Sequence, residues 1–138
     1  HQSGATQIDT LRANYQAAGV QAELTPFIDD TASAFAAADI IVCRAGASTV
    51  TEIAAVGAAA VFVPFPFAVD DHQTTNARFL VNAGGGWLVQ QSDLTPEGLA
   101  KMLLNSERTA LVDIAEKAKN MQKINATREV VAACEELA

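Results

Sequence analysis

The sequence ADIIVCRAGASTVTE, residues 38–52, carries the main signal for the fold. Its apolar run, Asp39 to Cys43, shows no alternation with polar residues, which is typical of a strand buried on both faces. A turn of small residues follows, and Ser48 to Val56 has a helical pattern that Gly57 ends. The stretch therefore predicts a strand, a tight turn and a helix in succession.

The same alternation continues on both sides of this stretch. Ala59–Val63 is predicted as the next buried strand, because the prolines that follow it cannot donate to a ladder. Strands that alternate with helices predict an α/β fold with a parallel, doubly wound sheet, in which Asp39–Cys43 and Ala59–Val63 are central neighbours. The other predicted strands are 21–25 and 87–90, and the other predicted helices are 6–19, 31–38 with an Asp29 or Asp30 cap, 70–83 with an Asp70 or Asp71 cap, one beginning at Thr95-Pro96-Glu97, 107–122 and 126–137.

Composition narrows the class of protein. The length of 138 residues fits one domain, and a net charge of −7 with nine Lys and Arg excludes a basic surface for nucleic acid. Cys43 and Cys134 have no spacing motif, which favours reduced thiols over a disulfide or a zinc site. The most apolar region, Ala54 to Val69, is too short and too interrupted by proline for a membrane span.

The first turn after a predicted strand carries phosphate chemistry. Ligands of doubly wound sheets bind at the carboxyl ends of the strands, where these turns lie. Gly46 and Ala47 allow close approach to the backbone, and the helix start at Ser48 and Thr49 offers free N–H groups to a diphosphate, with Arg44 as a forked cation. The alternative is a tight turn with a hydroxyl cap. A Gly-Lys-Ser/Thr motif is missing, which disfavours ATP hydrolysis.

Glu52 has two interpretations. With Thr49 it forms Thr-x-x-Glu, the pattern of a capping box. Its carboxylate is also suited to accept hydrogen bonds from both hydroxyls of a ribose.

Two further turns join the candidate site. Asp71, His72, Gln73 and Asn76 are suited to read the hydroxyls of a sugar, the alternative being a capping aspartate followed by a solvated helix face. Phe27 is placed to lie against a base while the backbone of Ile28 pairs with its edge, and the alternative is a hydrophobic staple ahead of a capped helix.

In combination, Arg-Ala-Gly-Ala-x-Thr-x-x-Glu at 44–52 and Asp-His-Gln-x-x-Asn-Ala at 71–77 resemble the MurG family, as do HQSG at 1–4, FIDD at 27–30 and VPFP at 63–66. The resemblance implies the C-terminal, Rossmann-like half of a GT-B glycosyltransferase that holds UDP-N-acetylglucosamine. It implies the following roles: Ile28 pairs with uracil beside Phe27; Glu52 binds the ribose; Gly46, Ala47, Ser48 and Thr49 line the diphosphate and sugar; Arg44 supports that turn; His72 and Gln73, supported by Asn76, contact the sugar hydroxyls.

The resemblance also implies an activity: inverting transfer of N-acetylglucosamine to lipid I, giving lipid II for peptidoglycan. The family places the lipid-linked acceptor, the membrane contact and the presumed catalytic base in an N-terminal domain, so no catalytic residue is assigned here. No cofactor and no protein-bound metal is expected, with a divalent cation such as magnesium as an optional aid. The full-length protein is expected in the cytoplasm, peripheral on the inner face of the bacterial inner membrane.

Such domains begin with a strand and a Gly-Gly-Ser loop, whereas this chain opens at His1. Residues 1–138 are therefore expected to be a single UDP-sugar-binding domain that lacks its first strand and is inactive alone. Three alternatives stay open: another UDP-sugar transferase, a UDP-N-acetylglucosamine epimerase, and a non-catalytic donor-binding subunit that needs a membrane partner.

Overall fold

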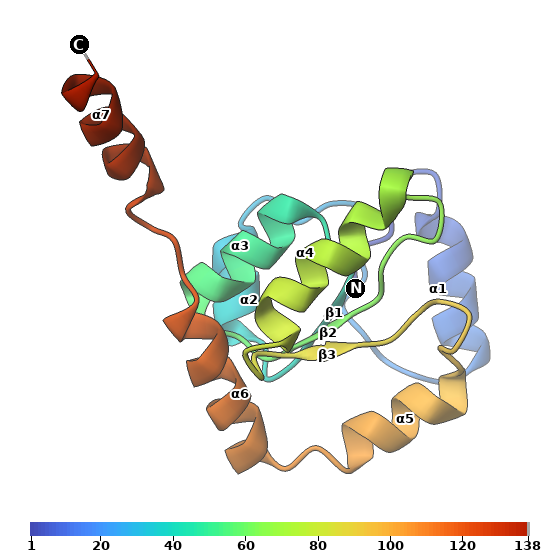
Figure 1. The fold of residues 1–138 in the computed structure, drawn as a ribbon. Helices are drawn as coiled ribbons and strands as arrows, with labels where there is room; N and C mark the ends of the chain where they lie inside the picture. The colour runs from blue at the N-terminus through green and yellow to red at the C-terminus, as the bar shows by residue number, and fades with distance from the viewer. Residues whose placement is uncertain (138) are drawn as a thin grey trace. The chain divides into compact units, whose positions relative to one another are not determined.

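The structure, a computed structural model, describes residues 1–137, which form two compact units: His1–Ala34 and the residues from Phe35 onward (Figure 1). The first unit holds α1 (Ile8–Ala17), and α2 (Thr31–Ala37) crosses the boundary between the units. The second unit holds β1 (Ile41–Cys43), α3 (Ala47–Val56), β2 (Ala60–Phe62), the 3-10 turn η1 (Val69–Asp71), α4 (His72–Val81), β3 (Trp87–Leu88), α5 (Pro96–Leu104), α6 (Arg108–Asn120) and α7 (Ala126–Glu136).

A three-stranded parallel sheet in the order β1-β2-β3 organises the second unit. Ile41 pairs with Ala60, and Val61 pairs with Trp87. The predicted α/β class and the predicted parallel pairing of the first two strands are confirmed. Strand β2 is buried along its whole length, as a central strand should be.

The prediction that Asp39–Cys43 is a central strand is wrong. The strand is shorter, beginning at Ile41, and it lies at the edge of the sheet that residues 1–137 form, with Val42 45% exposed. An apolar run predicts a strand with few solvent-exposed side chains, but it does not indicate how many strands lie beside it.

The first unit departs from prediction at residues 21–25. This segment is no strand, and only Gln2 and Thr25 form a parallel bridge. Two ladder bonds flank it: the Thr25 N–H donates to the His1 oxygen at 3.0 Å, and the Ser3 N–H donates to the Thr25 oxygen at 3.3 Å.

The helices of the first unit follow their local signals. Helix α1 ends before Gly19, whose φ of 65° suits glycine. Asp30 caps α2, because its Oδ1 accepts from the Ser33 N–H at 2.9 Å. Hydrogen bonds from the side chain and then the backbone of Ser33 lower the pKa of the Asp30 carboxyl.

Helices α3 and α4 pack against each other, and α3 also packs against α6, while α4 contacts β3 (Figure 1). The largest fully buried apolar side chains are those of Phe62, Ile53 and Leu80. No helix among residues 1–137 is both long and apolar enough to cross a membrane.

Glycines after α4 let α6 and β2 come close. A Cβ at Gly85 would lie 2.9 Å from the Cα and N of Ala118 in α6, and one at Gly86 would lie 2.8 Å from the oxygen of Ala60 in β2. The glycine run therefore does more than end a helix, because it also makes room for two neighbouring backbones.

Gly85→Ala should destabilise the fold by about 1–3 kcal/mol, because the new methyl group meets the Ala118 backbone, which cannot move alone. Urea unfolding followed by circular dichroism measures the change. Asn82→Ala, at an exposed position in the turn that follows α4, is the matched control and should leave the midpoint almost unchanged. Equal midpoints for the two variants would contradict the close approach.

Candidate functional site

The start of α3 is an uncapped helix end at the carboxyl edge of the sheet. Gly46 is the N-cap residue, in an extended conformation with φ −62° and ψ 150°, and no side chain caps the helix. The first intrahelical bond runs from the Val50 N–H to the Gly46 oxygen at 3.0 Å. The N–H groups of Ala47, Ser48 and Thr49 donate in none of the hydrogen bonds among residues 1–137. This arrangement suits an anion, and the hydroxyl-cap alternative is wrong.

Glu52 is not part of a capping box. In that motif the hydroxyl residue is the N-cap, yet Thr49 is the third residue of α3 and Glu52 the sixth. Glu52 is exposed and takes part in no hydrogen bond or ion pair among the described residues. Positions three and four apart share a helix face, so Ser48, Thr49 and Glu52 lie on one side of α3. The capping alternative is therefore excluded, which leaves the carboxylate free for a ligand.

Arg44 ties the ends of the strands together. Its Nη1 donates to the oxygens of Val63 at 3.2 Å and Pro64 at 3.0 Å, and its Nη2 donates to Oε1 of Gln91 at 2.7 Å. The guanidinium carbon lies 5.6 Å from the centre of the Phe65 ring, within cation–π range. Most of the guanidinium is thus engaged in supporting the turns around the site.

Two amide side chains of α4 bind the backbone N–H and the backbone oxygen of Ala45. The Ala45 N–H donates to Oε1 of Gln73 at 3.3 Å, and Nδ2 of Asn76 donates to the Ala45 oxygen at 3.1 Å. The same Gln73 oxygen accepts from the Phe65 N–H at 2.9 Å. Ala45 is fully buried, so these bonds fix the residue that leads into α3. Gln73 Nε2 and Asn76 Oδ1 are the polar atoms of these side chains left for a ligand.

The corner that leads into α4 is strained. Asp70 and Asp71 both have φ of 51°, a left-handed conformation that non-glycine residues rarely adopt. The predicted capping by an aspartate side chain is wrong: Asp71 is the N-cap residue, but its Oδ1 accepts from the Thr74 hydroxyl at 2.6 Å. His72 Nδ1 lies 2.8 Å from the Val69 oxygen. Because a carbonyl only accepts, Nδ1 carries the proton there, which leaves Nε2 for a ligand.

Phe27 and Ile28 belong to the first unit. Phe27 is 64% exposed. The Ile28 N–H, which was predicted to pair with a base, donates to Oε1 of Gln2 at 3.0 Å. A base edge would have to replace that side chain, and the predicted pairing stays a prediction.

Three polar residues of the site were missed from the sequence: Thr74, Gln90 and Gln91. Gln91 accepts from Arg44, and Gln90 Nε2 donates to the Thr74 hydroxyl at 3.1 Å. Both glutamines could have been predicted from their position just after β3, because the carboxyl ends of parallel strands lie at the same edge of the sheet.

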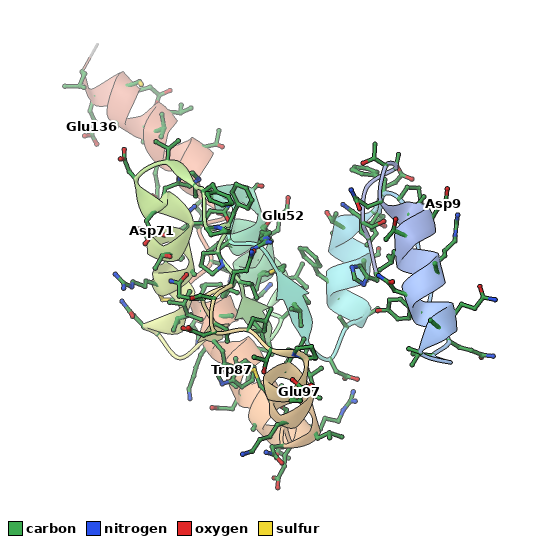
Figure 2. The ribbon with its side chains drawn as sticks, turned by 90° about the vertical axis from the view of Figure 1, so that its right-hand side faces the viewer. Asp9, Glu52, Asp71, Trp87, Glu97 and Glu136 are labelled. Atoms are coloured by element: carbon green, nitrogen blue, oxygen red, sulfur yellow. The ribbon has the colours of Figure 1, made fainter. Side chains whose placement is uncertain are left out.

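Figure 2 shows Glu52 and Asp71 toward one end of the second unit and Trp87, at the start of β3, toward the other. Gln73 and Asn76 in α4 lie beside the start of α3, because both bind the backbone of Ala45. Beside them is a cavity of about 220 Å³ lined by Ala47, Val50, Thr51, Ala54, Asn76, Phe79, Met121 and Lys123. Among residues 1–137, no group of three or more His, Cys, Asp and Glu side chains is arranged to hold a metal ion.

Cys43, at the end of β1, is a protonated thiol. Burial raises its pKa to about 12, from an ordinary value of 9.0. A thiol that is buried and neutral stabilises the fold below pH 9.0, and this contribution is lost as the pH rises through about 12. The thiolate is the nucleophile, so Cys43 has little reactivity near neutral pH.

At pH 8, a disulfide reagent such as Ellman's should label the exposed Cys134 at least about ten times faster than Cys43, because Cys43 is partly covered and protonated. Cys43→Ser and Cys134→Ser variants, each with one thiol left, separate the two rates. Both thiols should react alike in urea. Rapid labelling of Cys43 in the folded protein would contradict its burial.

Comparison with known proteins gives consistent matches along the chain. A family model described as glycosyltransferase family 28 C-terminal domain matches residues 1–133. A UDP-N-acetylglucosamine--N-acetylmuramyl-(pentapeptide) pyrophosphoryl-undecaprenol N-acetylglucosamine transferase from Paracidovorax citrulli (strain AAC00-1) is 78% identical over 137 residues, which are 99% of this chain and 39% of the relative. The transferase of the same name from Polaromonas naphthalenivorans (strain CJ2) is 76% identical over 138 residues, 100% of this chain and 38% of the relative.

A solved structure agrees with these relatives. The crystal structure of Acinetobacter baumannii MurG has a TM-score of 0.91 and 45% identity, and the match covers 99% of this chain and 42% of that chain. The predicted resemblance is confirmed. The chain spans about two fifths of the length of the curated relatives it matches.

Proposed function

The chain belongs to the glycosyltransferase family 28 C-terminal domains, and on that premise we propose that it is the donor-binding half of an inverting N-acetylglucosamine transferase. The donor would be UDP-N-acetylglucosamine and the acceptor lipid I, which becomes lipid II in peptidoglycan synthesis. The names of the relatives support this, since they specify an N-acetylglucosamine transferase acting on a pyrophosphoryl-undecaprenol substrate. Transferase names also favour this function over an epimerase or a non-catalytic subunit.

The observation that carries the proposal is the uncapped start of α3. Ala47, Ser48 and Thr49 present N–H groups without partners among residues 1–137, at the edge where Glu52 and the α4 amides also lie. In the transfer, an acceptor hydroxyl attacks the anomeric carbon, the bond from that carbon to the diphosphate oxygen breaks, and UDP leaves with the electron pair. Donors at a helix start stabilise the growing charge more than the ground state, which lowers the barrier.

The remaining site residues divide the donor between them. Glu52 would accept the two ribose hydroxyls, and Nε2 of His72 and Nε2 of Gln73 would reach the sugar hydroxyls. Arg44 and Asn76 would act mainly by holding the turns, as their bonds to backbone oxygens indicate. Phe27 and Ile28 would take the uracil.

Binding of the acceptor is proposed for the rest of the full-length protein. We propose that the rest of the full-length protein binds the lipid-linked acceptor, contacts the membrane at its cytoplasmic face and supplies the base that takes the acceptor's proton. Residues 1–138 would then act as one donor domain.

We expect the full-length protein to transfer without a metal held by its side chains, because peptide N–H groups meet the diphosphate. A divalent cation such as magnesium would act as a counter-ion. EDTA should therefore reduce the rate of UDP release by less than about ten-fold. A complete loss that is restored by stoichiometric metal would contradict this.

Glu52→Gln in the full-length protein should weaken UDP binding ten-fold or more, because two charge-assisted hydrogen bonds, each worth about 1.5–3 kcal/mol, lose part of their strength. The melting temperature should not change, since Glu52 caps nothing. Calorimetric titration of UDP and thermal unfolding measure the two effects.

Glu116→Gln, an exposed glutamate in the middle of α6, is the matched control and should bind UDP as the wild type does. Unchanged UDP affinity in Glu52→Gln would remove the ribose contact from the proposal.

A further inference from the structure

Thr74 has a special place in the first turn of α4. It is the buried polar residue of the described chain, with 2% of its surface exposed, and its hydroxyl makes two hydrogen bonds. It donates to Oδ1 of Asp71 at 2.6 Å and accepts from Nε2 of Gln90 at 3.1 Å. A hydroxyl has a single proton, so accepting from Gln90 directs that proton to the carboxylate.

This chain of bonds ends on the strained corner. Two consecutive left-handed aspartates cost free energy, and they persist only where the surroundings hold them. The Asp71 N–H donates to the Ala68 oxygen at 3.1 Å, and the side chain of Asp71 is held by Thr74. Without the Thr74 hydroxyl, Asp71 is free to relax toward the usual extended N-cap conformation.

The conformation of Asp71 sets where the first turn of α4 begins. His72 and Gln73 follow it directly, and both are proposed to meet the donor's sugar. The groups proposed for the nucleotide, which are the α3 start, Glu52, Phe27 and Ile28, lie on other elements. The α3 start does not depend on Gln73 alone, because Asn76 also holds it through the Ala45 oxygen. A shift at the corner should therefore act on the sugar more than on the nucleotide.

The segment after β3 binds α4 and the turn after β1 through two different residues. Gln90 reaches Thr74, whereas Gln91 reaches Arg44, which supports the ends of β1 and β2. The chain turns between them: Gln91 begins the turn at 91–93, which the Asp93 N–H closes by donating to the Gln90 oxygen at 2.9 Å. The two neighbouring glutamines therefore hold different parts of the site.

We propose that Gln90, Thr74 and Asp71 form a positioning relay that holds the corner before α4, and through it sets His72 and Gln73 against the sugar of the donor. Gln90 and Thr74 act as positioning residues and need no contact with the donor. They determine how much the sugar adds to the binding of the nucleotide, and the inference rests on the proposed function of the site.

The test compares two ligands in the full-length protein. Calorimetric titration with UDP and with UDP-N-acetylglucosamine gives two dissociation constants, and their ratio isolates the sugar's share. Thr74→Val keeps the buried volume and removes the hydroxyl, so the ratio should shift about five-fold or more against the sugar nucleotide, while the UDP constant stays within about two-fold of wild type. Thr74→Ser keeps the hydroxyl and should restore the wild-type ratio.

Two more variants complete the experiment. Gln90→Met leaves Thr74 in place and should shift the ratio in the same direction, which keeps the test decisive if Thr74→Val fails to fold. Thr75→Val, at the exposed neighbouring position, is the matched control and should change neither constant.

A lowered melting temperature with an unchanged ratio in Thr74→Val and Gln90→Met would overturn the relay, because Thr74 would then be a core residue only. Failure of the proposed function gives a different result: the wild-type protein would bind neither UDP nor UDP-N-acetylglucosamine.

Discussion

The two hydrogen bonds that α4 makes to the backbone N–H and C=O of Ala45 hold the candidate site together. Gln73 accepts from its N–H and Asn76 donates to its oxygen, so two amides from α4 hold the backbone that leads from β1 into α3. A buried peptide group must find partners, and here the partners come from a helix more than 25 residues away in sequence. That arrangement fixes the start of α3 relative to α4, and it places the free N–H groups of α3 beside the polar face of α4.

The site is therefore built mainly from bonds between turns. Arg44 joins the ends of β1 and β2 to the segment after β3, and Gln73 joins the Ala45 and Phe65 N–H groups through one oxygen. Polar side chains that are engaged in this way lose little entropy when a ligand arrives, because they are already ordered. The turns that these side chains hold carry the N–H groups of α3, and such preorganised donors stabilise the negative charge that grows on a leaving diphosphate.

The strained corner at Asp70 and Asp71 fits the same logic. Two left-handed aspartates are unfavourable locally, and they are found at the edge where the other binding groups gather. Strain that the surroundings maintain is common where a chain must present side chains at a defined angle. The buried hydroxyl of Thr74 supplies part of that maintenance.

Local patterns of the sequence were enough to predict the class of fold and to propose the turns that carry the site. The apolar runs at 39–43 and 59–63 and the helical patterns after them suffice to predict a parallel α/β sheet, because hydrophobic periodicity is a local property of the chain. The motifs at 44–52 and 71–77 located the site through their resemblance to known glycosyltransferases.

The contacts of the individual side chains follow from the tertiary structure. A capping box at Thr49 and Glu52 and an aspartate cap on α4 were locally reasonable. However, the N-cap of α3 is Gly46, three residues before Thr49, and the Asp71 carboxylate accepts from the Thr74 hydroxyl instead of capping α4. The edge position of β1, the roles of Gln90 and Gln91, and the grip of α4 on Ala45 all depend on contacts between residues distant in sequence. Such contacts follow from packing, which no local pattern records.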